Sequence, residues 1–130
     1  MNQPARVLVV EDEILIQTLI EEALAASGYA VAVADNGGAA LTQIEVDPST
    51  LQALVTDVGL GEGPNGWDVA RRARELIHDL PVVYITAENG SEWSAQGVPS
   101  STLVVKPFAV DQVVTAVSVL VNEAAAKRAT

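Results

Sequence analysis

Cysteine is absent from this chain of 130 residues, and aromatic side chains make up only 4% of it. Without cysteine there can be no disulfide, no thiolate metal site and no thiol nucleophile, which is typical of a cytosolic protein. Basic residues are scarce as well: seven Lys and Arg stand against seventeen Asp and Glu, a net charge of −10. A chain this acidic repels phosphate backbones and anionic lipids, so neither nucleic acid nor a membrane is an expected partner.

Long hydrophobic runs are also missing. Only four apolar residues, 7–10, separate the N-terminal segment from a cluster of acids, too few for a signal-peptide core or a membrane span. We therefore expect a cytoplasmic location. Hydrophobic residues nevertheless make up 49% of the chain and charged residues 18%, which argues against disorder. We expect one domain over residues 1–130, with its core at about 5–124 and a frayed helical tail at 125–130.

Short runs rich in Val, Ile and Leu recur along the chain without the clean alternation of half-exposed strands. They cover residues 7–10, 29–33, 51–55, 82–85 and 103–105. Such runs are typical of strands buried on both faces of a parallel sheet. With helical segments between them, they predict a doubly wound α/β fold of five strand–helix units. Its ligand site should lie outside the carboxyl ends of the strands.

The segments between the strands predict helices of unequal clarity. In the first, apolar residues from Ile16 to Leu24 follow helical spacing, and Asp12 is the expected cap. The second is expected over residues 37–46, the third from Gly66 and the fifth after Pro107. The fourth, over residues 88–96, contains Gly90 and lacks an apolar stripe, so we expect it to be short, irregular or mobile.

Polar side chains stand where four of the strands end. Glu11 and Asp12 follow the first strand, Asp57 the third, Thr86 ends the fourth, and Lys106 follows the fifth. Each alone is commonplace, because acids often occupy the first turn of a helix and Asp is common in turns. Together they place carboxylates and an ammonium at one edge of the sheet. Such a group can hold a divalent cation and a phosphoryl group.

On these residues the chain resembles the receiver domains of bacterial two-component response regulators, a family that includes the chemotaxis regulator. The matching motifs are Val-Leu-Val-Val-Glu-Asp-Glu (7–13), Leu-Val-Thr-Asp (54–57), Tyr-Ile-Thr-Ala (84–87) and Val-Val-Lys-Pro-Phe (104–108). The resemblance implies a flavodoxin-like sheet in the order 2-1-3-4-5. It also implies a phosphorylation-dependent switch in a phosphorelay, here expected to be free-standing, with no effector domain and no turnover of a separate substrate.

The resemblance assigns the metal site and the phosphoacceptor. Asp57 would accept the phosphoryl group. Mg²⁺ would be held by Asp12 and Asp57, by Glu11 through a water molecule, and by the backbone carbonyl of Gly59. A cation held by few protein oxygens and several waters suits Mg²⁺.

The resemblance also assigns the groups that contact the phosphoryl group, and the partners. Thr86 would offer its hydroxyl and Lys106 its ammonium, and the bond between Lys106 and Pro107 would be cis. A histidine kinase or a phosphotransfer protein would donate the phosphoryl group. The signal would leave through contacts with a downstream protein that the sequence does not identify.

The chain departs from the family pattern at several positions. Glu11 stands where Asp is more usual, the loop at residues 58–66 is about one residue longer than the common form, and Glu88 occupies a position that tunes dephosphorylation. Leu103 replaces the aromatic that many receivers carry as a switch on the fifth strand. We therefore hypothesise a different output, in which residues 88–99 order or rearrange on phosphorylation.

Apolar residues on the fifth helix extend beyond its core stripe. Ala116 and Leu120 lie beside that stripe and Val119 opposite it, which indicates either ordinary edge burial or a homodimer face. Both tryptophans, Trp67 and Trp93, are expected to be partly exposed.

Other functions are compatible with parts of the pattern. A pseudo-receiver would keep the fold as an interaction module without phosphorylation. An aspartyl-nucleophile phosphatase needs a second Asp where this chain has Gly59. A flavodoxin-type flavin binder needs a phosphate-cradling loop where this chain has three acids, at residues 11–13. His78, the only histidine, is expected to face the dipole at the end of the third helix.

Overall fold

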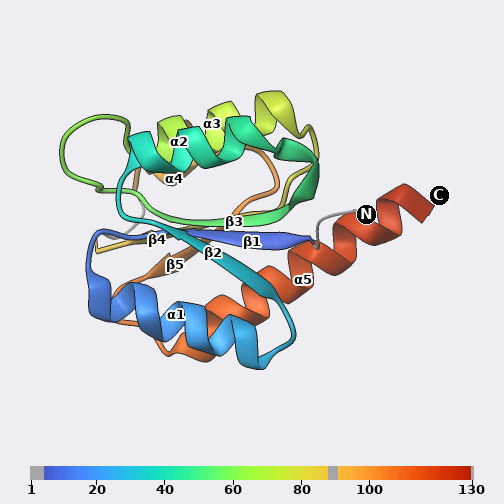
Figure 1. The fold of residues 1–130 in the computed structure, drawn as a ribbon, viewed down its shortest axis with the longest axis horizontal. Helices are drawn as coiled ribbons and strands as arrows, with labels where there is room; N and C mark the ends of the chain where they lie inside the picture. Colours follow the sequence, from blue (N-terminus) through green and yellow to red (C-terminus); the bar gives the residue numbers. More distant parts are fainter. Residues whose placement is uncertain (1–4, 88–90, 130) are drawn as a thin grey trace.

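A single parallel sheet of five strands lies at the centre of the computed structural model, which describes residues 5–87 and 91–129. The strands are β1 (Arg6–Val10), β2 (Ala30–Ala34), β3 (Leu51–Asp57), β4 (Val82–Thr86) and β5 (Thr102–Val105). Their order is β2-β1-β3-β4-β5, and every neighbouring pair is parallel (Figure 1). The predicted fold class and strand order are therefore confirmed.

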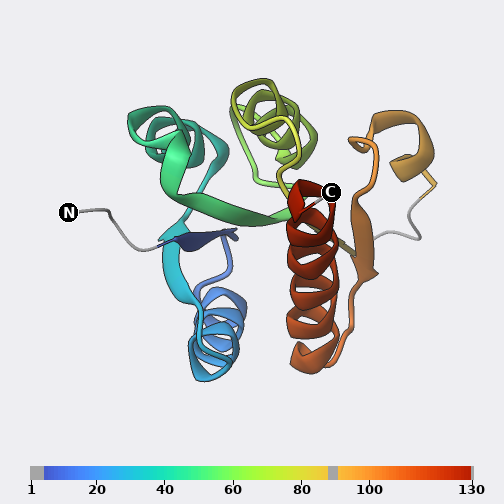
Figure 2. The same cartoon turned by 90° about the vertical axis from the view of Figure 1, so that its right-hand side faces the viewer.

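Helices cover both faces of the sheet. They are α1 (Ile14–Ala26), α2 (Gly37–Val46), α3 (Gly66–Leu76), α4 (Trp93–Gln96) and α5 (Val110–Ala129), with a 3₁₀ turn, η1 (Pro48–Thr50), before β3. The helices α2, α3 and α4 lie on one face, and α1 and α5 lie on the other (Figures 1 and 2). Within the described residues, no helix combines the length and the apolar character that crossing a bilayer requires.

Two apolar clusters fill the spaces between the sheet and its helices. Leu8, Leu54 and Tyr84 point toward α2 and α3, whereas Val9 and Val55 point toward α1 and α5. Successive side chains of a strand face opposite sides, so each central strand contributes to both clusters. This is why the strands read as continuous apolar runs and not as alternating ones.

Side-chain caps fix where two of the helices begin. Asn36 accepts a hydrogen bond from the Ala39 amide at the start of α2, and Asn65 forms a reciprocal capping box with Asp68 at the start of α3. The expected cap of α1 was wrong. That helix begins after Glu13, whose side chain makes no capping bond, so Asp12 lies outside the helix.

One helix end differs from what the sequence predicts. The helix α5 reaches Ala129, so residues 125–129 belong to it, and their fraying stays a prediction. The helix α3 ends at Leu76, and His78 lies beyond it with an exposed ring next to Asp79, so His78 is no dipole partner. The short fourth helix is confirmed, because α4 has only four residues. Glu88 and Gly90 lie outside the described residues.

Candidate functional site

The carboxyl ends of four strands meet around one cleft of about 350 Å³. The residues that line it include Asp12, Asp57, Gly59, Trp67, Thr86 and Lys106. They reach it because a parallel sheet brings the ends of β1, β3, β4 and β5 to the same edge. Backbone hydrogen bonds continue past the strand ends, from the Val58 amide to the Ile85 carbonyl at 2.9 Å and from the Lys106 amide to the Thr86 carbonyl at 2.7 Å.

Three carboxyl groups crowd into this edge of the sheet. Glu11, Asp12 and Asp57 each offer an oxygen, and these oxygens lie within 4.8 Å of one another. Glu11 is fully buried and Asp57 is 7% exposed, while Asp12 faces solvent. Hard oxygen ligands at this spacing suit Mg²⁺, which keeps several of its own waters and needs few protein groups.

The hydrogen bonding of the Glu11 carboxyl oxygens indicates whether a cation would fit the acidic cluster. Oε1 accepts a hydrogen bond from the Glu13 amide at 3.2 Å, but Oε2 is buried and has no hydrogen-bond partner among the described residues. Its nearest cationic group is Lys106 Nζ at 3.6 Å. A buried oxygen without a donor is costly, and a cation or its bound water would supply what Oε2 lacks. The donor set therefore fits Mg²⁺.

The crowding changes how Glu11 titrates. Burial, together with the charge of Asp57, raises the pKa of Glu11 to about 8, although the Glu13 amide and Lys106 act in the opposite direction. Without a cation, Glu11 therefore holds a proton near neutral pH. A bound divalent cation would displace that proton, because metal ligands must be deprotonated.

Lys106 supplies the positive charge of the site. Its Nζ lies 3.0 Å from Asp57 Oδ2, 3.6 Å from Glu11 Oε2 and 3.7 Å from Glu13 Oε1. Burial alone would lower the pKa of Lys106. The hydrogen bond and charge of Asp57, with the charges of Glu11 and Glu13, outweigh burial and raise this pKa. Lys106 is thus fully charged at neutral pH, and its bond to Pro107 is cis.

Gly66 lets the backbone approach Asp57 closely. A Cβ on Gly66 would lie 2.2 Å from the Asp57 carbonyl oxygen, so only glycine lets α3 begin there. The amide of Gly66 donates to the Val58 carbonyl at 2.9 Å, and that of Gly59 donates to Asp57 Oδ1 at 3.2 Å. The helix start at Gly66 was predicted from the sequence, but this contact was not.

Gln17 supports the acidic cluster from the first turn of α1, and the sequence did not single it out. Its buried side-chain amide donates to the Glu11 carbonyl at 3.0 Å and to Asp35 Oδ1 at 2.9 Å. The only signal was a polar residue beside the apolar stripe of α1. Gln17 fixes the backbone that carries Glu11.

Comparison with known proteins agrees with this geometry. The sequence model of one family, the response regulator receiver domain, matches residues 7–118. The chain belongs to the response regulator receiver family. Such receivers are modules of phosphorylation-dependent two-component signalling. The described geometry thus belongs to a receiver, as the motifs at the strand ends implied.

Two curated relatives illustrate the resemblance. The response regulator MprA of Mycolicibacterium vanbaalenii is 31% identical over 111 residues, which cover 84% of this chain and 47% of MprA. The response regulator receiver protein CpdR of Brucella abortus is 36% identical over 81 residues, which cover 62% of this chain and 65% of CpdR. This receiver therefore spans about half the length of MprA and somewhat less than two thirds of CpdR.

Solved structures give the same assignment. A response regulator receiver protein from Sinorhizobium medicae matches with a TM-score of 0.87 at 34% identity, covering 92% of this chain and 96% of that one. The response regulator TrrA of Thermotoga maritima, solved in complex with Mg²⁺ and BeF, matches with a TM-score of 0.73 at 30% identity, covering 89% and 98%.

The other residues of interest in the receiver lie in the cleft or in the apolar cluster on the α3 side of the sheet. Thr86 is buried at the end of β4 and lines it. Leu103 is half-buried on β5 and packs against the α3-side cluster with Trp93, which is half-buried as expected. Trp67 was expected to be partly exposed and is instead 6% exposed, because its ring packs 4.6 Å from that of Tyr84.

Proposed function

We propose that this receiver accepts a phosphoryl group on the carboxylate of Asp57. The donor would be a phosphohistidine of a histidine kinase or of a phosphotransfer protein. A new P–O bond to Asp57 forms as the P–N bond of the donor breaks, and the released imidazole keeps the electron pair and takes up a proton. The observation that carries the proposal is the 3.0 Å contact between Lys106 Nζ and Asp57 Oδ2, beside three clustered carboxyl groups.

Mg²⁺ would be held by the acidic cluster. Asp12 and Asp57 would bind it directly, Glu11 through a water molecule, and Gly59 through its backbone carbonyl. When bound, Mg²⁺ supplies positive charge that offsets the repulsion between the Asp57 carboxylate and the phosphoryl oxygens. The structure of TrrA with Mg²⁺ and BeF supports this assignment by similarity.

The chain's own groups would hold the phosphoryl group in place. Lys106 neutralises charge that develops on the transferred oxygens, because its ammonium is already aimed at Asp57. Thr86 lines the same cleft and would offer its hydroxyl to a phosphoryl oxygen. These groups would assist the receiver's own phosphorylation and dephosphorylation, and no turnover of a separate substrate is expected.

The output would pass through protein contacts in the cytoplasm, to a downstream protein yet to be identified. A homodimer through α5 is a weaker proposal. Ala116 and Leu120 are half-buried against the α1-side cluster, which accounts for their apolar character. Val119 is 49% exposed, so packing within the receiver does not account for an apolar side chain at this position.

Intact-mass measurement tests the phosphoacceptor. The protein is incubated with a small-molecule phosphodonor and Mg²⁺, and one phosphoryl adduct is expected. The adduct should be absent with Asp57→Asn, which removes the accepting carboxylate. It should also be absent in the presence of a chelator, which removes the Mg²⁺ that offsets the negative charges. Asp79→Asn, which changes an exposed carboxylate far from the cleft, is the matched control and should keep the adduct. An adduct that persists in Asp57→Asn would refute the assignment, and no adduct at all would favour a pseudo-receiver.

A further inference from the structure

The turn between α4 and β5, residues 97–101, is tied to neighbouring elements by two side chains. The hydroxyl oxygen of Tyr84, on β4, accepts a hydrogen bond from the Val98 amide at 3.0 Å. Arg74, on α3, donates from Nη1 to the Pro99 carbonyl and from Nε to the Leu80 carbonyl, both at 2.7 Å. Two consecutive residues of the turn are therefore held: Val98 by Tyr84 of the sheet, and Pro99 by Arg74 of α3.

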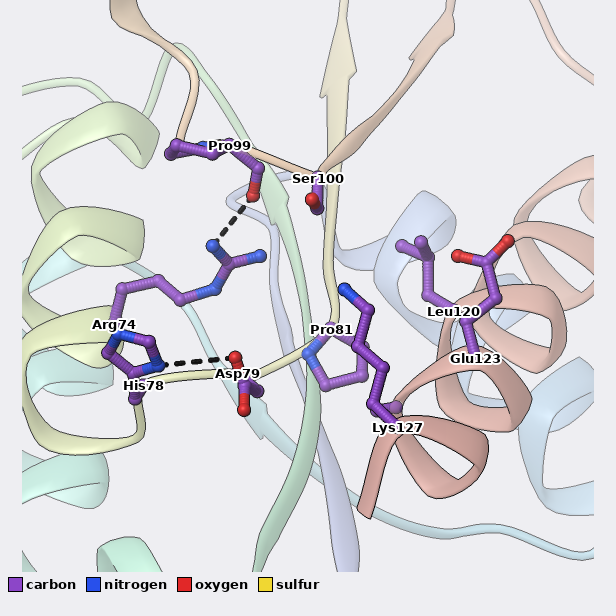
Figure 3. A pocket seen from close by; sticks show the side chains of 10 residues that line it. Arg74, His78, Asp79, Pro81, Pro99, Ser100, Leu120, Glu123 and Lys127 are labelled. Atoms are coloured by element: carbon purple, nitrogen blue, oxygen red, sulfur yellow. Dashed lines mark hydrogen bonds and ion pairs between the residues drawn. The ribbon is translucent and has the colours of Figure 1, made fainter. Parts of the chain in front are cut away.

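The contact between Arg74 and Pro99 borders a second cleft, at the amino ends of β4 and β5. This cleft has a volume of about 350 Å³, and Arg74 reaches across it to Pro99 (Figure 3). Charges of both signs line it, including Asp79, Glu123 and Lys127. Two donors of Arg74 bond backbone carbonyls at the edge of this cleft, so the cleft marks the α3 side of the turn.

Tyr84, which holds the Val98 amide, also packs toward the cleft that contains Asp57. Tyr84 is fully buried, and its ring centroid lies 4.6 Å from that of Trp67 at an interplanar angle of 58°. Trp67 in turn lines the cleft with Asp57 and Thr86. Tyr84 and Thr86 are two residues apart on β4, so their side chains leave the sheet on the same face. A continuous line of packed side chains therefore runs from the cleft to the Val98 amide.

We propose that the contact between Trp67 and Tyr84 carries the state of the cleft to the turn at residues 97–101, with Tyr84 as a positioning residue. The inference rests on the proposed function, in which the cleft takes a phosphoryl group. A group that enters beside Trp67 constrains its ring. Close-packed rings shift together, so a shift of Trp67 reaches the Tyr84 hydroxyl and the amide that it holds.

The hydroxyl of Tyr84 can hold the Val98 amide at any physiological pH. Burial raises the pKa of Tyr84, although the Val98 amide and the charges of Arg74 and Arg71 act against this. The hydroxyl is thus neutral throughout the physiological range, and its bond to Val98 does not depend on pH. A direct route is the alternative, because Ser91 and Glu92 also line the cleft and lead along the chain into α4. Removing the Tyr84 hydroxyl distinguishes the two routes.

Amide hydrogen exchange provides the test. Exchange of residues 97–101 is measured with and without Mg²⁺ and beryllofluoride, in the unmodified protein, in Tyr84→Phe and in Tyr29→Phe. Tyr84→Phe keeps the ring against Trp67 and removes only the hydroxyl. Tyr29→Phe is the matched control, because it removes the tyrosine hydroxyl that bonds Ser118 Oγ at 2.9 Å on the other face of the sheet.

In the unmodified protein, the ligand should change exchange at the turn by about three-fold or more, the effect of altering one hydrogen bond. In Tyr84→Phe, the turn should exchange faster without ligand, and the ligand should no longer change its rate. Tyr29→Phe should respond as the unmodified protein does. A merely structural role for Tyr84 would accelerate exchange but leave the response to ligand intact.

The outcomes separate this inference from the proposed function. A response at the turn in Tyr84→Phe equal to that of the unmodified protein would overturn the inference. So would protection near Asp57 and Thr86 with no change at residues 97–101, while the proposed function would stand. Failure of Mg²⁺ and beryllofluoride to alter exchange anywhere would sink both. If Tyr84→Phe does not fold, an unchanged exchange rate at residues 97–101 in the unmodified protein would still overturn the inference.

Discussion

Glu11 shows how burial changes a carboxyl group in a crowded site. Its side chain is fully buried, with one oxygen bonded to the Glu13 amide and the other without a hydrogen-bond donor among the described residues. Burial and the neighbouring Asp57 raise its pKa to about 8. In the absence of a cation, Glu11 therefore binds a proton at pH values where an unfolded chain has lost it.

That difference makes the stability of the metal-free protein depend on pH. The folded pKa of Glu11 lies above its ordinary value of 4.5, so the stabilisation is complete below about pH 4.5 and is lost as the pH rises through about 8. Urea unfolding in a chelator should show this fall. In Glu11→Gln, the fall in the free energy of unfolding between low and high pH should be smaller by on the order of 2 kcal/mol, since Gln does not ionise. Glu22→Gln, on the exposed side of α1, should leave the slope unchanged. A parallel fall in Glu11→Gln would contradict the assignment.

Among the elements, the start of α3 is tightly constrained. Asn65 and Asp68 cap it, and its first residue, Gly66, rests against the Asp57 carbonyl. The loop before it is held from a second side, because a Cβ on Gly37 of α2 would meet the Pro64 carbonyl oxygen at 2.1 Å. Two helix starts therefore enclose the segment that follows Asp57.

Gly66→Ala should destabilise the protein by about 1–3 kcal/mol, because the added methyl group forces α3 away from β3. Chemical unfolding measures the loss, and intact-mass phosphorylation should slow with it. Gly38→Ala is the matched control in the first turn of α2, where the nearest atom to the added Cβ is 3.5 Å away. That variant should be neutral or slightly stabilising, since Ala favours helix. Equal effects of the two substitutions would show that the contact at Gly66 is unimportant.

For the molecule as a whole, a net charge of −10 adds to the local repulsion among the carboxyl groups of the cleft. The cluster joins residues from the ends of β1 and β3, so a cation there would bind the folded state and not the unfolded chain. Binding of this kind raises the apparent stability in proportion to the logarithm of the ligand concentration.

Mg²⁺ should therefore raise the Tm of the unmodified protein. At a concentration about 100 times its Kd, the added stability is about 2.7 kcal/mol. Asp12→Asn should lose most of this increase, because an amide oxygen is a weaker ligand than a carboxylate. Asp79→Asn, exposed at the far end of the sheet, should keep it. Calorimetry in a chelator and in Mg²⁺ measures the difference, and an undiminished rise of Tm in Asp12→Asn would exclude that residue as a ligand.

The sequence by itself determined the fold class, the position of nearly every strand and helix, and which polar side chains reach one edge of the sheet. It could do so because periodicity is local, and because parallel strands end on the same side. Glu11, Asp57 and Lys106 were predictable for that reason.

Tertiary structure alone decided how those side chains are surrounded. The burial of Trp67, the support from Gln17 and the tie between Tyr84 and the Val98 amide each join segments that lie far apart in the chain. The pKa of Glu11 depends on the same packing, because burial is its largest cause. Spacing along the sequence carries no record of such contacts, which arise only when the helices close over the two faces of the sheet.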